Sequence, residues 1–477
     1  MADFNFKKWN LTLGWLAFLI AFISYSLTVE PTVSFWDAGE YILTSSKLQV
    51  GHPPGAPFFQ MMGAFFSIFA SEPSQIGLMI NMMSATASAF TILFMFWSIV
   101  LLIKQVTKSE TEPSKNQNSA ILGAAFVGSL SFAFTDSFWF NAVETEVYAM
   151  ATLILAIMFY LGLRWEKDMF TPRGNKWLIL ISFVVGLSFG VHFMGILTIP
   201  AISLIYFFKN YKTVTVKNFI LANVAGIAIL LFVFKLLAPN ILRYFSVLEI
   251  FFVNTVGLPF NSGSIIALIL LVGFIYWGLN YTRKKGYVRL NTGLLCITFV
   301  VVGFSSWVML PIRANANVTV NENNPSSARE LLAYYNLEQY PKTHLFYGPQ
   351  FTDQYVGLDE NEPYIDDKPK YEKDETAGKY VIVNDYKNGL QNYNSEHASF
   401  LPRMWSAEHA ENYMIYAGFL EFSIKPEYKM QNDLRSLVGN FKDSVTKGEV
   451  DYEDYNDFLK KYGRYIDIQK PSLLKNI

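Results

Sequence analysis

Two pairs of acidic residues stand out in this sequence because their spacing could bring carboxylates together. Asp37 and Glu40 are three residues apart, so on a helix they would share one face. Glu144 and Glu146 are two residues apart, so in an extended segment both side chains would point the same way. Paired carboxylates can hold a cation or take a proton from a reacting hydroxyl. Spacing alone leaves simpler roles open: Asp37 could cap a helix beside a solvated Glu40, and a helix N-terminus favours acids such as Glu144 and Glu146.

Two histidines and three cations are further candidates. His52 lies in a Gly-His-Pro-Pro-Gly segment, where packing against the prolines is the alternative to a functional role. His192 falls in a turn between two apolar stretches, and a hydrogen-bonded structural histidine is the alternative there. Cations near a membrane surface could clamp a phosphate group. The candidates for that role are Arg313, Lys235 and Arg243.

The composition indicates a membrane protein. Of 477 residues, 52% are hydrophobic and only 16% are charged. The formal net charge of -1 and the lack of a basic stripe outside the membrane flanks argue against a nucleic-acid partner. The single cysteine, Cys296, lies in an apolar run, which excludes disulfides and cysteine-based metal sites.

Long uncharged runs predict about nine membrane-spanning helices, because a span needs roughly 20 apolar residues. One run, 177–208, is too long for a single untilted span, so we expect a hairpin of two short helices that bends near Gly186, Gly190 and Gly195. The run 58–70 is short for a span and is expected to form an interfacial or re-entrant helix. The other runs are 10–29, 73–103, 116–135, 147–163, 218–234, 264–282 and 290–312.

The basic residues predict the orientation of these spans. With nine spans, 16 of the 19 Lys and Arg residues before residue 312 fall on one side, which the positive-inside rule makes cytoplasmic. The N-terminus is then cytoplasmic, and 10–29 is a retained first helix rather than a cleaved signal peptide. All four paired acids fall on the opposite side. We therefore expect a multi-pass membrane protein whose C-terminal part is extracytoplasmic.

The predicted domains are a transmembrane module, 1–311, and an acidic, mixed soluble domain, 312–477. Helices are expected at 331–335 and 400–419, and an exposed charged loop at 359–377. The tyrosines of this domain suit an interface with another protein. The alternative is an ordinary solvated domain that packs over the membrane module.

Four motifs together resemble the DUF2723 family of GT-C membrane glycosyltransferases, the bacterial relatives of an animal protein O-mannosyltransferase. The resemblance runs over essentially the whole chain. Each motif alone is a weak signal, but the four motifs together are specific. The motifs are Trp36-Asp37-x-Gly-Glu40, His52-Pro53-Pro54-Gly55-x-Pro57, Glu144-x-Glu146-Val147-Tyr148, and Pro311-x-Arg313 followed by Asn321-Glu322-Asn323-Asn324-Pro325.

The resemblance implies an inverting transfer of a sugar, with mannose favoured, from a polyprenyl-phosphate-linked donor to Ser or Thr hydroxyls of exported proteins. Asp37 would be the base, and Glu40 would position the acceptor or support Asp37. Acids of the second motif hold Mg²⁺ or Mn²⁺ in some GT-C enzymes and no metal in the protein O-mannosyltransferases, so a metal on Asp37, Glu144 and Glu146 stays open. Supporting roles would fall to Glu144, Glu146, His52 and Tyr148. The donor phosphate would meet Arg313, His192 and Arg243.

Bacterial members of the family run longer, with further membrane helices, so the chain is expected to be a fragment, a split-gene product or a short form. Two other functions compete with the transferase. One is a non-catalytic subunit of an export or glycosylation complex. The other is a lipid or solute transporter, which would place ionisable residues at mid-membrane in broken helices. The charges of this chain instead gather at the ends of the apolar runs.

Overall fold

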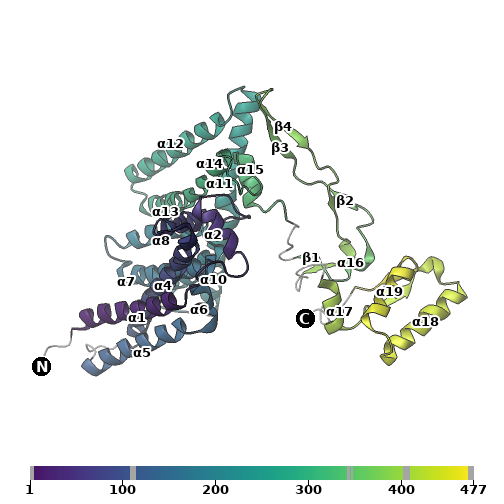
Figure 1. Ribbon diagram of the computed structural model, residues 1–477, viewed down its shortest axis with the longest axis horizontal. Coiled ribbons are helices and arrows are strands. Elements are labelled where there is room, and N and C mark those ends of the chain that lie inside the picture. Colours follow the sequence, from purple (N-terminus) through teal and green to yellow (C-terminus); the bar gives the residue numbers. More distant parts are fainter. Residues whose placement is uncertain (1–4, 108–113, 341–343, 345–346, 401–408, 471–477) are drawn as a thin grey trace. The chain divides into compact units, whose positions relative to one another are not determined.

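The computed structural model describes residues 5–107, 114–340, 344, 347–400 and 409–470. The chain divides into two compact units, Met1–Gln339 and Tyr340–Ile477. Figure 1 traces the helices and strands of both units along the sequence.

The first unit is helical throughout. Its α-helices are α1 (Phe6–Thr28), α2 (Ala38–Ser46), α3 (Pro57–Ser67), α4 (Ile76–Val106), α5 (Lys115–Ala133), α6 (Asp136–Ala142), α7 (Val147–Asp168), α8 (Asn175–Ser188), α9 (Thr198–Asn210), α10 (Val216–Leu231), α11 (Ala238–Ile250), α12 (Ser262–Lys284), α13 (Val288–Phe304), α14 (Met309–Asn315) and α15 (Ala328–Tyr335). Short 3-10 or π-helical turns join them: η1 (Pro73–Gln75), η2 (Phe193–Leu197), η3 (Phe232–Leu237), η4 (Phe251–Thr255) and η5 (Ser305–Val308).

Seven helical segments of the described chain are long and apolar enough to cross a membrane, or eight if the bent pair α5–α6 is one span. The predicted polytopic helical membrane region is therefore confirmed, with seven to eight candidate spans in place of about nine. The difference lies in α5–α6, which bends by 69°, and in α8. With 14 residues, α8 is about 21 Å long, shorter than the roughly 30 Å hydrocarbon core of a bilayer.

The long run 177–208 does form two helical pieces, α8 and η2–α9, but its glycines act differently from the prediction. None of Gly186, Gly190 and Gly195 has a positive φ. A Cβ atom on Gly186 would lie 2.1 Å from the Val300 backbone oxygen, so this glycine allows α8 to pack closely against α13. A Cβ atom on Gly190 would meet Phe58 in the same way. The glycines provide close packing rather than backbone flexibility.

The predicted short helix at 58–70 corresponds to α3. Its 11 residues begin with Pro57, whose fixed φ suits the first position of a helix. The helix packs against α2 and α4. Phe65, Ile68 and Phe69 at its end are exposed, as a helix that rests in a membrane interface would require.

The second unit is a mixed α/β domain, as predicted. Its elements are β1 (Tyr347–Pro349), α16 (Asp353–Val356), β2 (Tyr364–Ile365), β3 (Lys370–Asp374), β4 (Lys379–Asn384), β5 (Leu390–Gln391), η6 (Ser395–His397), β6 (Ala398–Phe400), α17 (Ala410–Ala417), β7 (Phe422–Ile424), η8 (Pro426–Tyr428), α18 (Asn432–Lys447), α19 (Tyr452–Tyr462), η9 (Gly463–Tyr465) and β8 (Ile466–Ile468). Its strands form antiparallel pairs: β1 with β6, β2 with β5, β3 with β4, and β7 with β8. Tyr455, Phe422 and Phe458 are central to its core.

Two details of this region differ from the sequence prediction. The expected loop at 359–377 contains β2, which pairs with β5, and β3, which forms a two-stranded ribbon with β4. Lys370 and Glu372 of β3 are exposed. Of the expected helix at 400–419, residues 401–408 lie outside the described residues, and α17 follows them.

The units divide after Gln339, later than the predicted boundary after residue 311. The reason is α15, the helix predicted at 331–335, which packs into the core of the first unit. Its residues Leu331, Leu332, Tyr334 and Tyr335 are all buried there.

Candidate functional site

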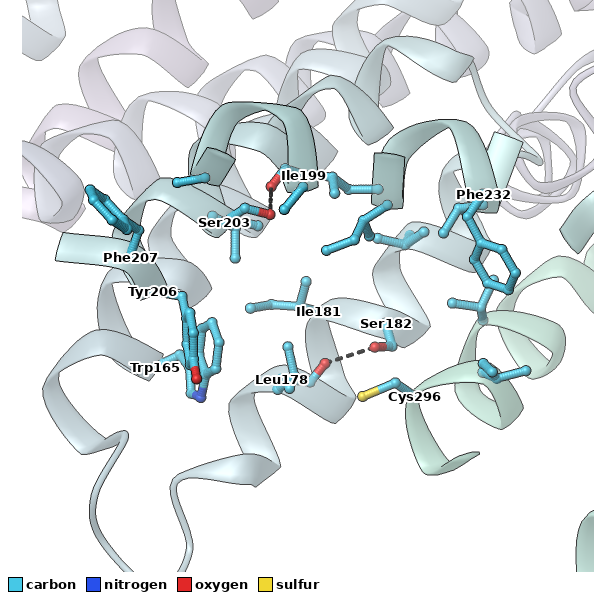
Figure 2. Close-up of a pocket in the computed structure, with 18 of the residues that line it drawn as sticks. Trp165, Leu178, Ile181, Ser182, Ile199, Ser203, Tyr206, Phe207, Phe232 and Cys296 are labelled. Atoms are coloured by element: carbon cyan, nitrogen blue, oxygen red, sulfur yellow. Dashed lines mark hydrogen bonds between the residues drawn. The ribbon is translucent and has the colours of Figure 1, made fainter. Parts of the chain in front are cut away.

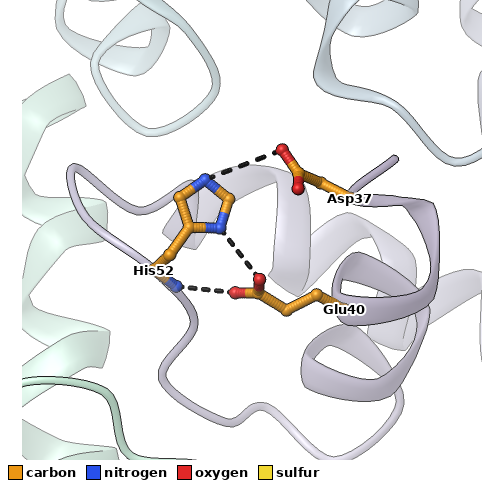
Figure 3. Close-up of side chains that lie close together, drawn as sticks. All are labelled: Asp37, Glu40 and His52. Atoms are coloured by element: carbon orange, nitrogen blue, oxygen red, sulfur yellow. Dashed lines mark hydrogen bonds and ion pairs between the residues drawn. The ribbon is translucent and has the colours of Figure 1, made fainter. Parts of the chain in front are cut away.

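Asp37, Glu40 and His52 come together at the start of α2, and we call them the acid–histidine cluster. Figure 3 shows the imidazole of His52 between the two carboxylates. Nδ1 of His52 lies 3.0 Å from Glu40 Oε2, and the His52 backbone N–H donates to Glu40 Oε1 at 2.6 Å. The second ring nitrogen, Nε2, lies 4.0 Å from Asp37 Oδ2. Glu40 is therefore held at both oxygens, whereas Asp37 is only approached by the imidazole.

The Asp37 side chain does not cap α2. It occupies the N-cap position but makes no side-chain hydrogen bond to the first turn of the helix. Its side chain is 59% exposed, against 26% for Glu40. The simpler role that the spacing left open, helix capping, is not seen, and the carboxylate of Asp37 is open to an incoming group.

Close backbone packing holds Glu40 against the loop that carries His52. A Cβ atom on Gly51 would lie 2.6 Å from Glu40 Oε1, so a larger residue there would displace this carboxylate. The Tyr334 hydroxyl donates to the Gly51 backbone oxygen at 2.6 Å. A parallel β-bridge also pairs Val50 with Asn321. The His52 loop is thus fixed by residues that come almost 300 positions later in the chain.

The hydrogen bonds of the cluster shift two pKa values in opposite directions. The hydrogen bond to Glu40 raises the pKa of His52, against the effect of partial burial, and the charge of Asp37 adds to the rise. Partial burial raises the pKa of Glu40, but the side-chain and backbone hydrogen bonds from His52 outweigh it and leave that pKa lowered. Both shifts favour an imidazolium–carboxylate pair, which places a positive charge beside Asp37.

The second acidic pair is buried. Glu144 is 3% and Glu146 6% exposed. Burial raises the pKa of both carboxyls, and for Glu146 the value reaches about 7 because the charges of Asp37 and Glu144 add to the effect of burial. Glu146 precedes α7 but makes no side-chain capping bond, and its Oε1 atom has no hydrogen-bond partner. Because the charge of Asp37 acts on the Glu146 carboxyl, the second acidic pair lies close to Asp37.

Asn81 on α4 ties the two acidic motifs together. Its amide group donates to the backbone oxygens of Glu30 and Thr32 at 2.7 and 2.8 Å. Its carbonyl oxygen accepts a short hydrogen bond from the Thr145 hydroxyl, between the two buried acids. The sequence reasoning missed Asn81, although a completely buried asparagine inside the apolar run 73–103 was a usable signal.

Glu322 is a second residue near the site for which the sequence predicted no role. Its backbone N–H donates to the Val50 oxygen at 3.1 Å. Burial, and to a smaller extent the charge of Glu40, raise the pKa of the Glu322 carboxyl. The charge of His52 partly offsets this rise. The Asn-Glu-Asn-Asn-Pro motif therefore contributes an acid near the cluster.

The predicted phosphate-binding residues are more dispersed. The ring of His192 lies 5.3 Å from that of Tyr148, two residues after Glu146. His192 Nδ1 accepts the Met194 N–H at 3.1 Å, and burial lowers the pKa of this imidazole. Its neutral form therefore carries its proton on Nε2. Arg313 donates to the backbone oxygens of Leu48 and Lys47 at 2.5 and 3.1 Å, so it anchors the end of α2.

Arg243 is exposed on α11. Lys235 lies in η3 with Nζ 4.8 Å from the centre of the Phe234 ring. Among the described residues, no measured contact joins either cation to the acid–histidine cluster.

The cluster is also a candidate cation site. One ligand atom from each of Asp37, Glu40 and His52 lies within 4.8 Å of the others. Among the described residues, no other group of three potential metal ligands has its ligand atoms this close together. The set expected from the sequence was Asp37, Glu144 and Glu146. Two carboxylates with one imidazole suit Mn²⁺ better than Mg²⁺, which prefers oxygen ligands alone.

The fold and the site together define a polytopic helical membrane protein with a carboxylate–imidazole cluster between its first two long helices. Residues 37–215 match the family model "Protein O-mannosyl-transferase TMEM260 N-terminal domain". That range includes both acidic motifs, His52, Tyr148 and His192. Residues 341–477 match a family of unknown function, DUF8416.

Two curated relatives are similar over the first part of the chain. Protein O-mannosyl-transferase tmem260 of Dictyostelium discoideum is 26% identical over 206 residues, which are 41% of this chain and 23% of that protein. Protein O-mannosyl-transferase TMEM260 of Mus musculus is 23% identical over 167 residues, 34% of this chain and 21% of that protein. The matched region thus covers less than a quarter of each relative's length. No solved structure gives a significant match.

Proposed function

We propose that this chain is an inverting glycosyltransferase of the GT-C type, similar to the protein O-mannosyltransferases that it matches. It moves a sugar, with mannose favoured, from a polyprenyl-phosphate-linked donor to Ser or Thr hydroxyls of exported proteins. The observation that carries the proposal is the carboxylate of Asp37, which is exposed, makes no capping bond and lies beside the His52–Glu40 pair.

The reaction is a direct displacement at the anomeric carbon. The acceptor oxygen forms a bond to this carbon while the bond from the carbon to the phosphate oxygen breaks. The hydroxyl proton passes to the Asp37 carboxylate, and the electron pair of the broken bond leaves with the polyprenyl phosphate. A hydroxyl is a weak nucleophile, so a carboxylate placed to accept its proton lowers the barrier as charge develops.

The other residues of the site position these groups. Glu40 holds His52, whose positive charge lies 4.0 Å from Asp37 and offsets the crowding of several acids in one place. Glu144 and Glu146 support Asp37. Tyr148 and His192, whose rings lie 5.3 Å apart, contact the acceptor or the donor phosphate. Arg313 is the proposed second phosphate contact, since its anchoring bonds use only two of its five N–H groups.

The basic-residue bias supports a site on the outer face of the inner membrane. The N-terminus is then cytoplasmic, and the C-terminal domain is periplasmic, where exported acceptor proteins and other subunits of an export complex would meet it.

A divalent cation at the cluster is a second form of this mechanism. Asp37, Glu40 and His52 would hold it, and it would stabilise charge on the leaving phosphate. The cation would bind the neutral imidazole, because a protonated His52 cannot be a ligand. Transfer that is lost with EDTA and restored by Mn²⁺ would support the cation instead.

Asp37→Asn tests the proposal. With a polyprenyl-phosphate-mannose donor and a Ser/Thr peptide, we expect the purified variant to lose sugar transfer by about 100-fold or more, the range for removing a general base. The Asn side chain is isosteric and Asp37 makes no capping bond, so membrane insertion and elution from size-exclusion chromatography should not change. Asp136→Asn, at the exposed start of α6, is the matched control and should keep its activity.

Transfer by Asp37→Asn at the rate of the control would refute the role of this carboxylate. A wild-type chain that transfers no sugar would favour the non-catalytic subunit. Donor-independent movement of a lipid or solute across vesicles would favour a transporter.

A further inference from the structure

Arg164 is a partly buried cation near the end of α7. Its Nη1 atom donates to the Tyr160 hydroxyl at 3.1 Å, whereas its Nε atom is buried and has no hydrogen-bond partner. Among the described residues, no Asp or Glu side chain forms an ion pair with this guanidinium. Removing a charge from water without an opposite charge nearby is costly, so an anion on the open side of Arg164 would stabilise it.

The two acids nearest to Arg164 along α7 are already engaged. Glu166 forms an ion pair with Lys209 at 2.5 Å. Asp168 accepts the indole N–H of Trp177 at 2.8 Å. An anion that neutralises Arg164 therefore has to come from outside the described part of the chain.

The indole ring of Trp177 brings a second cation to the same place. The Arg164 Cζ atom lies 4.9 Å from the centre of this ring, and the Lys176 Nζ atom lies 4.7 Å from it. Lys176 is exposed, and it also forms no ion pair with an acid of the described residues. Two cations held by one aromatic ring suit a phosphate group, which both arginine and lysine bind.

The position of Arg164 on α7 corresponds to a membrane surface. Arg164 comes 18 residues after Glu146, which is about 27 Å along a helix. The hydrocarbon core of a bilayer is about 30 Å thick, so Arg164 and the buried acids lie near opposite faces of the membrane. Tryptophan is enriched at membrane surfaces, and the phosphates of lipid headgroups lie at this level.

Packing fixes the helices that carry these side chains. Trp165 and Leu178 line one end of an apolar cavity of about 650 Å³ between the helices of the first unit (Figure 2). Each of them directly follows Arg164 or Trp177 in the sequence. The ring of Trp165 also stacks on that of Tyr206, 5.7 Å away. The two cations and the indole are thus held by packed helices, which lowers the cost of ordering them around a ligand.

We propose that Arg164, Lys176 and Trp177 form a binding site for the phosphate of an anionic phospholipid, at the membrane face opposite the acid–histidine cluster. The guanidinium and the ammonium bind the phosphate oxygens, and the indole ring holds the two cations in place. The two uncompensated positive charges select a lipid with a net negative charge over a zwitterionic one. The site involves no sugar transfer, so the inference is independent of the proposed function.

The test is binding of phosphatidylglycerol to the purified full chain in a neutral detergent, measured by native mass spectrometry. We expect Arg164→Gln to weaken binding by about ten-fold, because the variant loses a charge-assisted phosphate contact. Arg289→Gln, at an exposed position in the first turn of α13, is the matched control and should change binding by no more than about two-fold. Phosphatidylcholine, which has no net charge, should bind the wild type about as weakly as phosphatidylglycerol binds Arg164→Gln.

Lys176→Gln keeps the test decisive if Arg164→Gln does not fold. Lys176 is exposed, so its replacement should leave the fold intact and weaken binding by about three-fold. Equal binding of phosphatidylglycerol by the site variants and Arg289→Gln would overturn the proposal, as would equal binding of the two lipids by the wild type. Displacement of phosphatidylglycerol by millimolar inorganic phosphate would also overturn it, because the site would then take a soluble phosphate rather than a lipid.

Discussion

At the residue scale, Glu146 is the acid whose surroundings oppose ionisation most clearly. Its side chain is 6% exposed, and Oε1 lacks a hydrogen-bond partner. Burial and the charges of Asp37 and Glu144 raise its pKa to about 7, so near neutral pH this carboxyl exists in both forms. A group of this kind can share or pass a proton at the site without a large energetic cost.

The raised pKa has a consequence for stability. The folded state binds the Glu146 proton more tightly than the unfolded state, in which the pKa is about 4.5. The contribution to stability is therefore complete below about pH 4.5 and is lost as the pH rises to about 7, by roughly 3 kcal/mol at most. We expect Glu146→Gln to be more thermostable than the wild type at pH 8 and close to it at pH 5. Thermal unfolding in detergent at the two pH values measures the difference.

The exposed Glu72 supplies the matched control, because Glu72→Gln should change the melting temperature equally little at both pH values. A stabilisation by Glu146→Gln that is the same at pH 5 and pH 8 would mean that this carboxyl titrates normally.

At the scale of elements, the site depends on segments that are far apart in sequence. Residues 30–32 follow α1, and Thr145 precedes α7, yet both bind to Asn81 of α4. The helix α2 is in turn fixed at its end by Arg313 of α14. Membrane helices thus serve as the frame on which the two acidic loops meet.

Asn81→Ala tests this frame. The change leaves two part-buried backbone oxygens and the buried Thr145 hydroxyl without their partner, which should destabilise the first unit by about 1–3 kcal/mol. Sugar transfer should fall as well, since Glu144 and Glu146 would no longer be held in position relative to Asp37. Asn223→Ala is the control, because the Asn223 side chain donates only to Phe219 of its own helix. Equal melting temperatures for the two variants would contradict the bridging role.

At the scale of the whole molecule, the chain consists of two units with separate cores. The segment after the last apolar helix does not leave the first unit at once. Tyr334 donates to the backbone oxygen of Gly51, next to His52, and Tyr335 donates to the backbone oxygen of Phe234 in η3. The helix α15 is therefore part of the site's support.

Two truncations distinguish this arrangement from a boundary at residue 311. A chain of residues 1–339 should elute as a single folded species and keep most of its thermal stability. A chain of residues 1–327 lacks α15 and should be much less stable, since each large buried side chain contributes about 1.5–3 kcal/mol. Equal melting temperatures for the two truncated chains would refute the support by α15.

Much of the fold could be predicted because crossing a membrane is a local property of sequence. Apolar runs identified the long helices, and the short run near Phe59 identified α3. About nine spans were predicted and seven to eight helical segments of the described chain qualify, because apolar composition does not reveal the 69° bend of α5–α6. The close packing at Gly186 could not be predicted either, since it depends on the neighbouring helix α13.

The sequence by itself determined a polytopic helical chain and the acids that could do chemistry, because residue type and spacing carry that information. The tertiary structure decided what surrounds each acid. It joined Glu40 to His52, left Asp37 without a cap and buried Glu146 with one oxygen unpartnered. These contacts depend on how loops close over distant helices, and a pKa depends on burial and neighbouring charge, which no spacing along the chain reports.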